Sequence, residues 1–583
     1  MGTALHAVTG RAPDGRWLRA GVLAAVFGGL ILPILAGLAE TARAAFGLMA
    51  AAGAGGWNLE PWGRFAGLPG LGTSLTVTLT TGVGATLLSL VLAAGFCAAT
   101  HGRLTAWAAG RLLAPFLAAP HAAVAIGLAF VIAPSGWIAR ALTPLVGWER
   151  PPELVTVHDP WGLALTAGLV VKEVPFLALV MLTALTRIPV RAQLAAGRSL
   201  GYAPGAVWLK TILPQIWPLI RLPVWAVLAY SLSVVDMAMI LGPSNPPTLA
   251  VMLTRMFGDP DVQARLPASA GALVQGVIVL AACLALWLSE GAVARLGLGW
   301  LRRGGRGRRI GPAVHVAALA AAALLALGAL AMTSMALWSL AWRWPFPRLL
   351  PETWSLRAWG AAGAGWLRPL GQTLMLAGAT TLLSLVLAIA WLEGEDRGRM
   401  VRAGWAEALI YAPLLVPQIA FVYGLNVAFL STGLPDGLAA VVWAQVLFVF
   451  PYLMIALSDP WRSLDPRLLR AAASLGAGPT RRLLAVKLPI LLSPLLTAAA
   501  IGIAVSVAQY LPTLFLGGGR IATLTTEAVA LSSASDRRIA GVYATLQAAL
   551  PFLAYLAAFA VPAVLHRNRR GLRGGRHGKE DPT

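Results

Sequence analysis

The sequence is poor in cysteine and lacks the motifs of nucleotide-binding enzymes. Its two cysteines, Cys97 and Cys283, lie inside apolar runs, which excludes a disulfide framework and a metal–thiolate site. The seven histidines are scattered, and none lies at the spacing of metal ligands. The only Gly-Lys pair, Gly578-Lys579, is followed by Glu580 rather than by serine or threonine, so the phosphate-binding loop of common ATPases is missing. We therefore expect no catalytic residues, no metal and no cofactor in this chain.

Charged residues are also scarce. They make up 12% of the chain, against roughly 25% in soluble domains, whereas 58% of the residues are hydrophobic. This composition predicts a membrane protein. The net charge of +22 would suggest nucleic acid as a partner of a soluble protein, but an excess of basic residues is typical of the cytoplasmic loops of membrane proteins. We therefore expect membrane lipid, and no nucleic acid, as a partner.

Long apolar segments alternate with short polar ones along the chain. We predict an all-α polytopic membrane protein with about 12 transmembrane helices, because such segments can cross the hydrocarbon core of a bilayer. They lie near residues 21–38, 72–98, 107–133, 161–186, 218–241, 271–298, 313–341, 372–392, 404–430, 437–458, 490–516 and 540–565. The first segment could be a signal peptide, but it is longer than the roughly 7–15 apolar residues of such peptides, so a retained anchor is favoured.

The chain also contains an internal duplication. Thr86–Ala93 and Thr381–Ala388 both read TLLSLVLA. Other matching pairs are Pro120 with Pro417, Gly127 with Gly424, Pro175 with Pro451, Ser199 with Ser474, Gly201 with Gly476, Pro204 with Pro479, and Pro214 with Pro489. The separation falls from 297 positions (417 − 120) to 275 (476 − 201), because the first half carries extra residues around Trp137–Pro160. The duplication predicts two parallel six-helix repeats.

These patterns divide the chain into five parts. They are an N-terminal segment (1–20), a first repeat (21–300, with its core at about 70–298), a basic linker (301–312), a second repeat (313–565) and a basic tail (566–583). If the N-terminus is inside, the linker, the tail and other basic loops all fall on the cytoplasmic side. We therefore expect a multi-pass protein with both termini in the cytoplasm.

One polar stretch in each repeat predicts a short helix–turn–helix: Arg191 to Pro214 and Asp465 to Pro489. In the second stretch, Asp465 can cap a helix that starts at Pro466. Leu468, Leu469, Ala472 and Leu475 recur at three- and four-residue spacing and form one apolar face. Gly476 follows as a residue that can adopt positive φ, and a second helix is expected to stop at Leu488-Pro489.

This pair of stretches resembles the EAA loop of permease subunits in binding-protein-dependent (type I) ABC importers. That family has Glu-Ala-Ala, glycine at the seventh position, and Leu-Pro at the nineteenth and twentieth. The matching residues are Ala195, Ala196, Gly197, Gly201, Leu213 and Pro214 in the first stretch, and Arg470, Ala471, Ala472, Gly476, Leu488 and Pro489 in the second. The glutamate is missing from both. We call residues 191–214 and 465–489 the first and second candidate coupling loops.

The resemblance implies a fused permease of the bacterial inner membrane, with both permease halves in one chain. Its partners would be a cytoplasmic ABC ATPase, as a dimer that uses the ATP, and a solute-binding protein outside. Fused permeases for thiamine and for ferric iron have a similar layout, and Thr523–Leu531 (TLTTEAVAL) looks closer to the thiamine branch. The alternatives are a secondary transporter driven by an ion gradient, and loops that merely connect helices.

Few polar residues lie inside the apolar segments, and such residues are candidates for the translocation pathway. We choose Asp236, and Gln509 as its counterpart because Ser233 and Ser506 align. Asp236 could instead be a structural carboxyl group between helices. Lys172 and Glu173 are expected to pair locally or to lie at the membrane interface.

Two loops follow these polar residues at matching places. They are Pro243–Leu249 and Gly517–Leu524, in which Thr248 and Leu249 match Thr523 and Leu524. They resemble the loops that gate the pathway at the outer face. Connectors without a specific role are the alternative.

Overall fold

The computed structural model describes residues 14–101, 106–307, 310–360, 365–398, 404–433, 437–533, 536–565 and 567. Secondary structure in these residues is nearly all helical, and the only strands among them form two short antiparallel pairs. β1 (Leu48–Met49) pairs with β2 (Ala54–Gly55), and β3 (Ala341–Arg343) pairs with β4 (Thr353–Trp354). The expectation of an all-α polytopic fold is confirmed.

The α-helices of the two halves follow one another in the same order. The first half contains α1 (Asp14–Val26), α2 (Leu32–Ala45), α3 (Glu60–Ala66), α4 (Leu71–Thr100), α5 (Ala106–Ala118), α6 (His121–Ile132), α7 (Trp137–Val146), α8 (Leu163–Leu185), α9 (Val190–Ser199), α10 (Pro204–Val207), α11 (Leu213–Ser233), α12 (Asp236–Leu241), α13 (Leu249–Phe257) and α14 (Arg265–Arg302). The second half contains α15 (Ile310–Leu340), α16 (Arg357–Gly360), α17 (Leu367–Gly398), α18 (Gly404–Tyr411), α19 (Gln418–Ser431), α20 (Leu438–Arg462), α21 (Pro466–Ser474), α22 (Pro479–Arg482), α23 (Leu488–Ile490), α24 (Leu492–Ala508), α25 (Leu511–Leu516), α26 (Leu524–Ser532) and α27 (Arg537–Leu565).

Within the described ranges, ten helices are long and apolar enough to cross a membrane, or up to twelve if two bent pairs each count as one span. One pair, Gly404–Leu414 with Gln418–Ser431, is bent by 90° just before Pro417, and Pro479–Ile490 with Leu492–Ala508 is bent by 78°. The segment expected near 107–133 is also divided, into α5 and α6, immediately before Pro120 and His121. Proline caps α6 and α19 at matching positions, because it lacks the N–H that a continuous helix would need.

Equivalent helices make equivalent contacts in the two halves. α4 packs against α8 and α11, as α17 packs against α20 and α24. The backbone N–H of Leu249, the first residue of α13, donates to Thr78 Oγ1 at 2.9 Å. The N–H of Leu524, the first residue of α26, donates to Thr373 Oγ1 at the same distance. Thr248-Leu249 and Thr523-Leu524 are thus structural counterparts, as the sequence match indicated.

The first long helix of each half packs against the other half. α2 lies along α19, and α15 lies along α6. A Cβ atom at Gly424 of α19 would overlap the backbone of Gly37, and one at Gly127 of α6 would overlap the backbone of Ala331. Glycine at these matched positions permits the close approach of helices that is typical of membrane proteins. The two halves are therefore interlocked rather than placed side by side.

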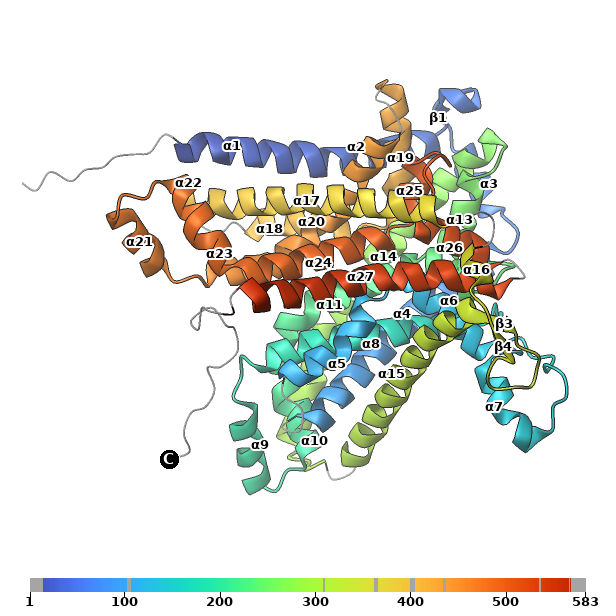
Figure 1. Cartoon of the computed structure of the whole chain (residues 1–583), viewed down its shortest axis with the longest axis horizontal. Coiled ribbons are helices and arrows are strands. Elements are labelled where there is room, and N and C mark those ends of the chain that lie inside the picture. The colour runs from blue at the N-terminus through green and yellow to red at the C-terminus, as the bar shows by residue number, and fades with distance from the viewer. Residues whose placement is uncertain are drawn as a thin grey trace, which may run out of the picture.

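Several short helices lie at the two ends of the long ones (Figure 1). Helices α9, α10, α21 and α22, which belong to the candidate coupling loops, lie at one end. The hairpins β1–β2 and β3–β4, together with α3, α7, α13 and α16, lie at the opposite end. Both candidate coupling loops are therefore presented on the same end of the protein.

Candidate functional site

The second candidate coupling loop begins as the sequence indicated. Asp465 Oδ1 accepts a hydrogen bond from the Arg467 N–H at 2.8 Å, and Pro466 occupies the first position of α21. Gly476 has a φ of 81° and Gly201, its counterpart in the first loop, has a φ of 79°. The helix in each loop therefore turns at a glycine in the left-handed region, which residues with a Cβ atom rarely adopt.

In the second loop the helix ends at Ile490, one residue beyond the expected stop at Leu488-Pro489, and a bend of 78° separates it from α24. Each loop passes through a π-helical turn, Trp208–Ile212 or Leu483–Lys487, immediately before its Leu-Pro pair. The N–H of Leu213 donates to Trp208 O, five residues back, and the N–H of Leu488 donates in the same way to Leu483 O. The wider turn shifts the hydrogen-bond pattern where proline has no N–H to donate. In the first loop this makes one continuous helix, Pro204–Ser233.

Several residues of the predicted coupling set lie on the surface of the loops. Ala195, Ala196, Arg470 and Ala471 are exposed, whereas Gly197 and Ala472 are half-buried. A Cβ atom at Gly197 would overlap the Val207 side chain, so glycine allows α9 to pack on α10. At Gly476 an added Cβ atom would meet nothing within 4 Å, and at Gly201 it would contact the Arg306 guanidinium group.

Matched leucines project from both loops, and the sequence analysis missed three of them. Leu200 and Leu475 directly precede the turn glycines and are 66% and 87% exposed. Leu209 and Leu484 are 43% and 59% exposed. Both pairs share the separation of 275 positions (475 − 200 and 484 − 209), which could have revealed them. Exposed leucines on a polar helix–turn–helix are typical of a surface that a partner covers.

The two loops are attached to the protein by different contacts. In the first loop, Lys210 Nζ donates to Gly305 O at 2.7 Å and lies 4.3 Å from the centre of the Trp300 ring. The Ala203 N–H also donates to Arg306 O at 3.1 Å. The segment that joins the two repeats thus packs directly on the first loop.

The second loop is held by carboxylates at the end of α17. Lys487 is 4% exposed, and its Nζ lies 2.5 Å from both Glu393 Oε2 and Asp396 Oδ2. The guanidinium group of Arg397 approaches Glu393 Oε1 at 2.8 Å from the other side. Among the described residues, an ion network centred on the buried pair Lys487 and Glu393 therefore fixes this loop.

Asp236 and Gln509 both lie at helix breaks, but they are not structural counterparts. α11 ends at Ser233 and α24 ends at Ala508, so the equivalent of Asp236 is Leu511 and the equivalent of Gln509 is Val234. The alignment of Ser233 with Ser506 was misleading because it is displaced by two residues from the helix ends. Both side chains are buried, and Gln509 Oε1 accepts a hydrogen bond from Gln418 Nε2 at 3.3 Å.

The residues around Asp236 come from separate helices. The Tyr230 hydroxyl group hydrogen-bonds to Asp236, and the Tyr230 ring lies 4.5 Å from the ring of His121. His121 Nε2 lies 3.5 Å from Glu173 Oε1. Lys172, the neighbour of Glu173, donates instead to the carbonyl groups of Phe116, Leu117 and Ala119 at the end of α5. Lys172 therefore caps the C-terminal end of α5 instead of pairing with Glu173 as expected.

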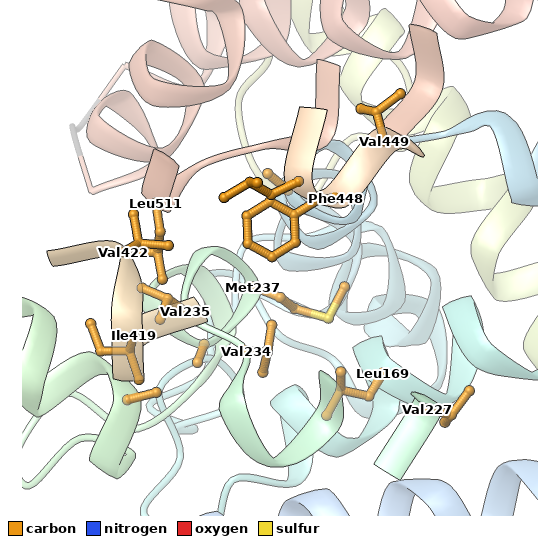
Figure 2. Close-up of a cluster of buried hydrophobic side chains, with 14 of the residues drawn as sticks. Leu169, Val227, Val234, Val235, Met237, Ile419, Val422, Phe448, Val449 and Leu511 are labelled. Carbon is orange, nitrogen blue, oxygen red and sulfur yellow. The ribbon is translucent and has the colours of Figure 1, made fainter. Parts of the chain in front are cut away.

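An apolar cluster closes the contact between the two halves close to these groups (Figure 2). Val234, Val235 and Met237 from the first half meet Val422, Phe448 and Leu511 from the second half. All six side chains are buried. Such a cluster can block the passage of a polar solute until the halves move apart. Among the described residues, no group of three or more His, Cys, Asp or Glu side chains is placed to hold a metal ion.

Comparison with known proteins gives one long match and several short ones. No family model matches the chain. It is 30% identical over 457 residues to the inner membrane ABC transporter permease protein YnjC of Escherichia coli, and the match covers 78% of this chain and 81% of that protein. It is 31% identical over 161 residues to the molybdenum transport system permease protein ModB of Azotobacter vinelandii, covering 25% and 70%. It is 25% identical over 143 residues to the spermidine/putrescine transport system permease protein PotC of Haemophilus influenzae, covering 24% and 54%.

Proposed function

The chain belongs to the permease family of ABC transporters, and we propose that it forms the substrate pathway of an import system driven by a separate cytoplasmic ATPase. It is a multi-pass membrane protein, and its relatives are permease components of transport systems. The observation that carries the proposal is the pair of candidate coupling loops, which lie at one end of the protein with matched exposed leucines.

The two loops offer two docking surfaces, which suits a dimeric ATPase. Leu200 and Leu475 would each enter an apolar groove on one ATPase subunit, and the glycine turn that follows would set the direction of each leucine. The helix that follows each turn leads into α11 or α24, which reach the breaks at Val234 and Gln509. In the first loop a displacement could therefore reach the apolar cluster between the halves along one continuous helix, and in the second loop it would pass across the bend at Leu491.

At the opposite end, a solute-binding protein would deliver the substrate. The loops before α13 and α26 are the surfaces that we assign to this contact. Thiamine-like compounds and ferric iron are the candidate substrates from the sequence resemblance. We place the loops with exposed leucines in the cytoplasm, on the basis of the basic residues around them.

Capture of the ATPase tests this proposal. The experiment uses a candidate partner ATPase from the same organism, co-expressed with an affinity-tagged permease. Leu475→Asp and Leu200→Asp should each reduce capture, and the double variant should abolish it, because a charged group cannot be buried in an apolar groove. Leu154→Asp, at a leucine exposed in a loop far from both stretches, is the matched control. Undiminished capture by the double variant would refute docking through these loops.

A further inference from the structure

We propose that polar side chains at the meeting of the two halves bind a small organic cation on its way through the permease. The site consists of His121, Glu173, Tyr230 and Asp236 from the first half, and Tyr452 and Tyr510 from the second. The inference rests on the proposed function as an importer and adds the chemical class of the substrate.

The contacts of these groups join elements from both halves. His121 begins α6 and lies against Glu173 of α8 and Tyr230 of α11. Asp236 begins α12, within hydrogen-bonding reach of Tyr230. From the second half, Tyr452 lies within electrostatic range of Glu173, and Tyr510 lies within electrostatic range of Asp236. The site therefore forms only where the two repeats meet.

The duplicated fold shows that these polar groups are not needed for packing. The structural counterparts of Glu173, Tyr230 and Asp236 in the second half are Val449, Val505 and Leu511. Val449 and Leu511 are buried in the apolar cluster of Figure 2. Burial of a carboxylate is costly, and the second repeat adopts the same arrangement without it. The helix arrangement itself therefore does not require carboxylates at these positions.

The balance of charge in the site favours a cation. Glu173 and Asp236 contribute two carboxylates, and His121 is the one basic side chain in contact with them among the described residues. The neighbouring Lys172 is held by three backbone carbonyl groups at the end of α5, where its charge compensates the negative end of that helix.

The aromatic rings favour an organic cation. Tyr230, Tyr452 and Tyr510 remain partly exposed although each lies within or next to a helix in the membrane region. Tyrosine rings attract cations over their faces, and this attraction is strongest for weakly hydrated ammonium groups in a desolvated site. Asp236 directly precedes Met237 of the apolar cluster, so a cation held here would lie at the barrier between the halves.

Binding to the purified full-length chain in lipid nanodiscs tests the proposal. The probes are thiamine, choline and spermidine, with molybdate as the anionic comparison, all at constant ionic strength and up to about 10 mM. Wild-type protein should bind at least one of the cations and bind molybdate more weakly. Asp236→Asn and Glu173→Gln should each weaken cation binding by about tenfold or more, because a desolvated charge pair is lost. Glu149→Gln removes an exposed carboxylate elsewhere and should leave binding unchanged.

A second variant separates binding from folding. Tyr510→Leu removes a ring without changing a charge and should weaken cation binding by about threefold or more. Size-exclusion elution and melting temperature without ligand identify any variant that fails to fold. Failure of all three cations to bind, equal binding of molybdate, or full binding by Asp236→Asn would overturn the cation site. These results would leave capture of the ATPase intact, whereas loss of capture alone would count against the proposed function.

Discussion

The ammonium group of Lys487 lies 2.5 Å from Glu393 Oε2, and both side chains are buried. This contact joins the second candidate coupling loop to the end of α17, a long helix of the same repeat. The first loop has no equivalent pair, because Ile212 occupies the position that matches Lys487. The two loops therefore present similar surfaces but are held to the rest of the protein by different contacts.

Replacement of Lys487 by methionine tests whether this ion network positions the loop. Removal of one partner of a buried ion pair leaves the other charge uncompensated and costs roughly 3–5 kcal/mol. We expect Lys487→Met to speed hydrogen–deuterium exchange in residues 465–489 and to reduce ATPase capture, with little change in the first loop. Lys487→Met combined with Glu393→Gln should recover part of the protection. Unchanged exchange in the single variant would show that the network does not hold the loop.

The turn glycine of the second loop gives a prediction about backbone strain. Gly476 has a φ of 81°, and an added Cβ atom would meet no neighbouring atom, so a side chain there is disfavoured only by the backbone conformation. Gly476→Val should cost roughly 1–3 kcal/mol of local strain. We expect normal expression and membrane insertion, but much weaker transport and ATPase capture.

Asparagine provides the control for that variant, because it tolerates the left-handed region better than other residues with a Cβ atom. Gly476→Asn should therefore retain most of the capture that Gly476→Val loses. Equal capture by wild type, Gly476→Val and Gly201→Val would show that the loops are plain connectors.

Arg470 occupies the place of the glutamate in the EAA pattern and is exposed on α21. We expect it to face an acidic or neutral patch on its ATPase. Arg470→Glu should then reduce capture more than Arg470→Ala does, because it places like charges together, and the difference should shrink at high salt. Equal effects of the two substitutions at low salt would contradict an acidic patch.

Orientation in the membrane is testable with single cysteines. Ser199 and Ser474 are exposed and 275 positions apart (474 − 199), one in each loop, so Ser199→Cys and Ser474→Cys in a chain without Cys97 and Cys283 report on both loops. In intact cells both should resist a membrane-impermeant thiol reagent, whereas Glu149→Cys in an outer loop should react. Rapid labelling at position 199 or 474 would show that the candidate coupling loops lie outside the cell, opposite to the predicted orientation.

The sequence predicted the helical membrane fold and the glycine turns because these depend on local signals. Apolar length predicts a span, and matched glycine, proline and N-cap residues predict the ends of short helices. The same signals did not reveal the π turns before Leu213-Pro214 and Leu488-Pro489, or the continuation of the first of these helices to Ser233.

The surroundings of Asp236 could not be predicted for a different reason. His121, Glu173 and Tyr230 lie on three separate helices, and apolar periodicity does not indicate which faces of buried helices meet. No glycine or proline marks the helix break at Val234 in the sequence. The two repeats were therefore aligned on Ser233 and Ser506, which gave the wrong counterpart for Asp236. Lys210 and Lys487 likewise look similar in sequence, but one binds backbone carbonyl groups and the other binds carboxylates.

Substrate uptake into proteoliposomes tests the account most directly. The vesicles contain this chain with its candidate partner ATPase, and the candidate solute-binding protein is added on the outer side. We predict that uptake requires ATP on the side of the candidate coupling loops, is absent without the ATPase, and is unaffected when proton and sodium gradients are collapsed. Uptake by the chain alone, driven by an ion gradient and independent of ATP, would contradict the assignment as a permease powered by a separate ATPase.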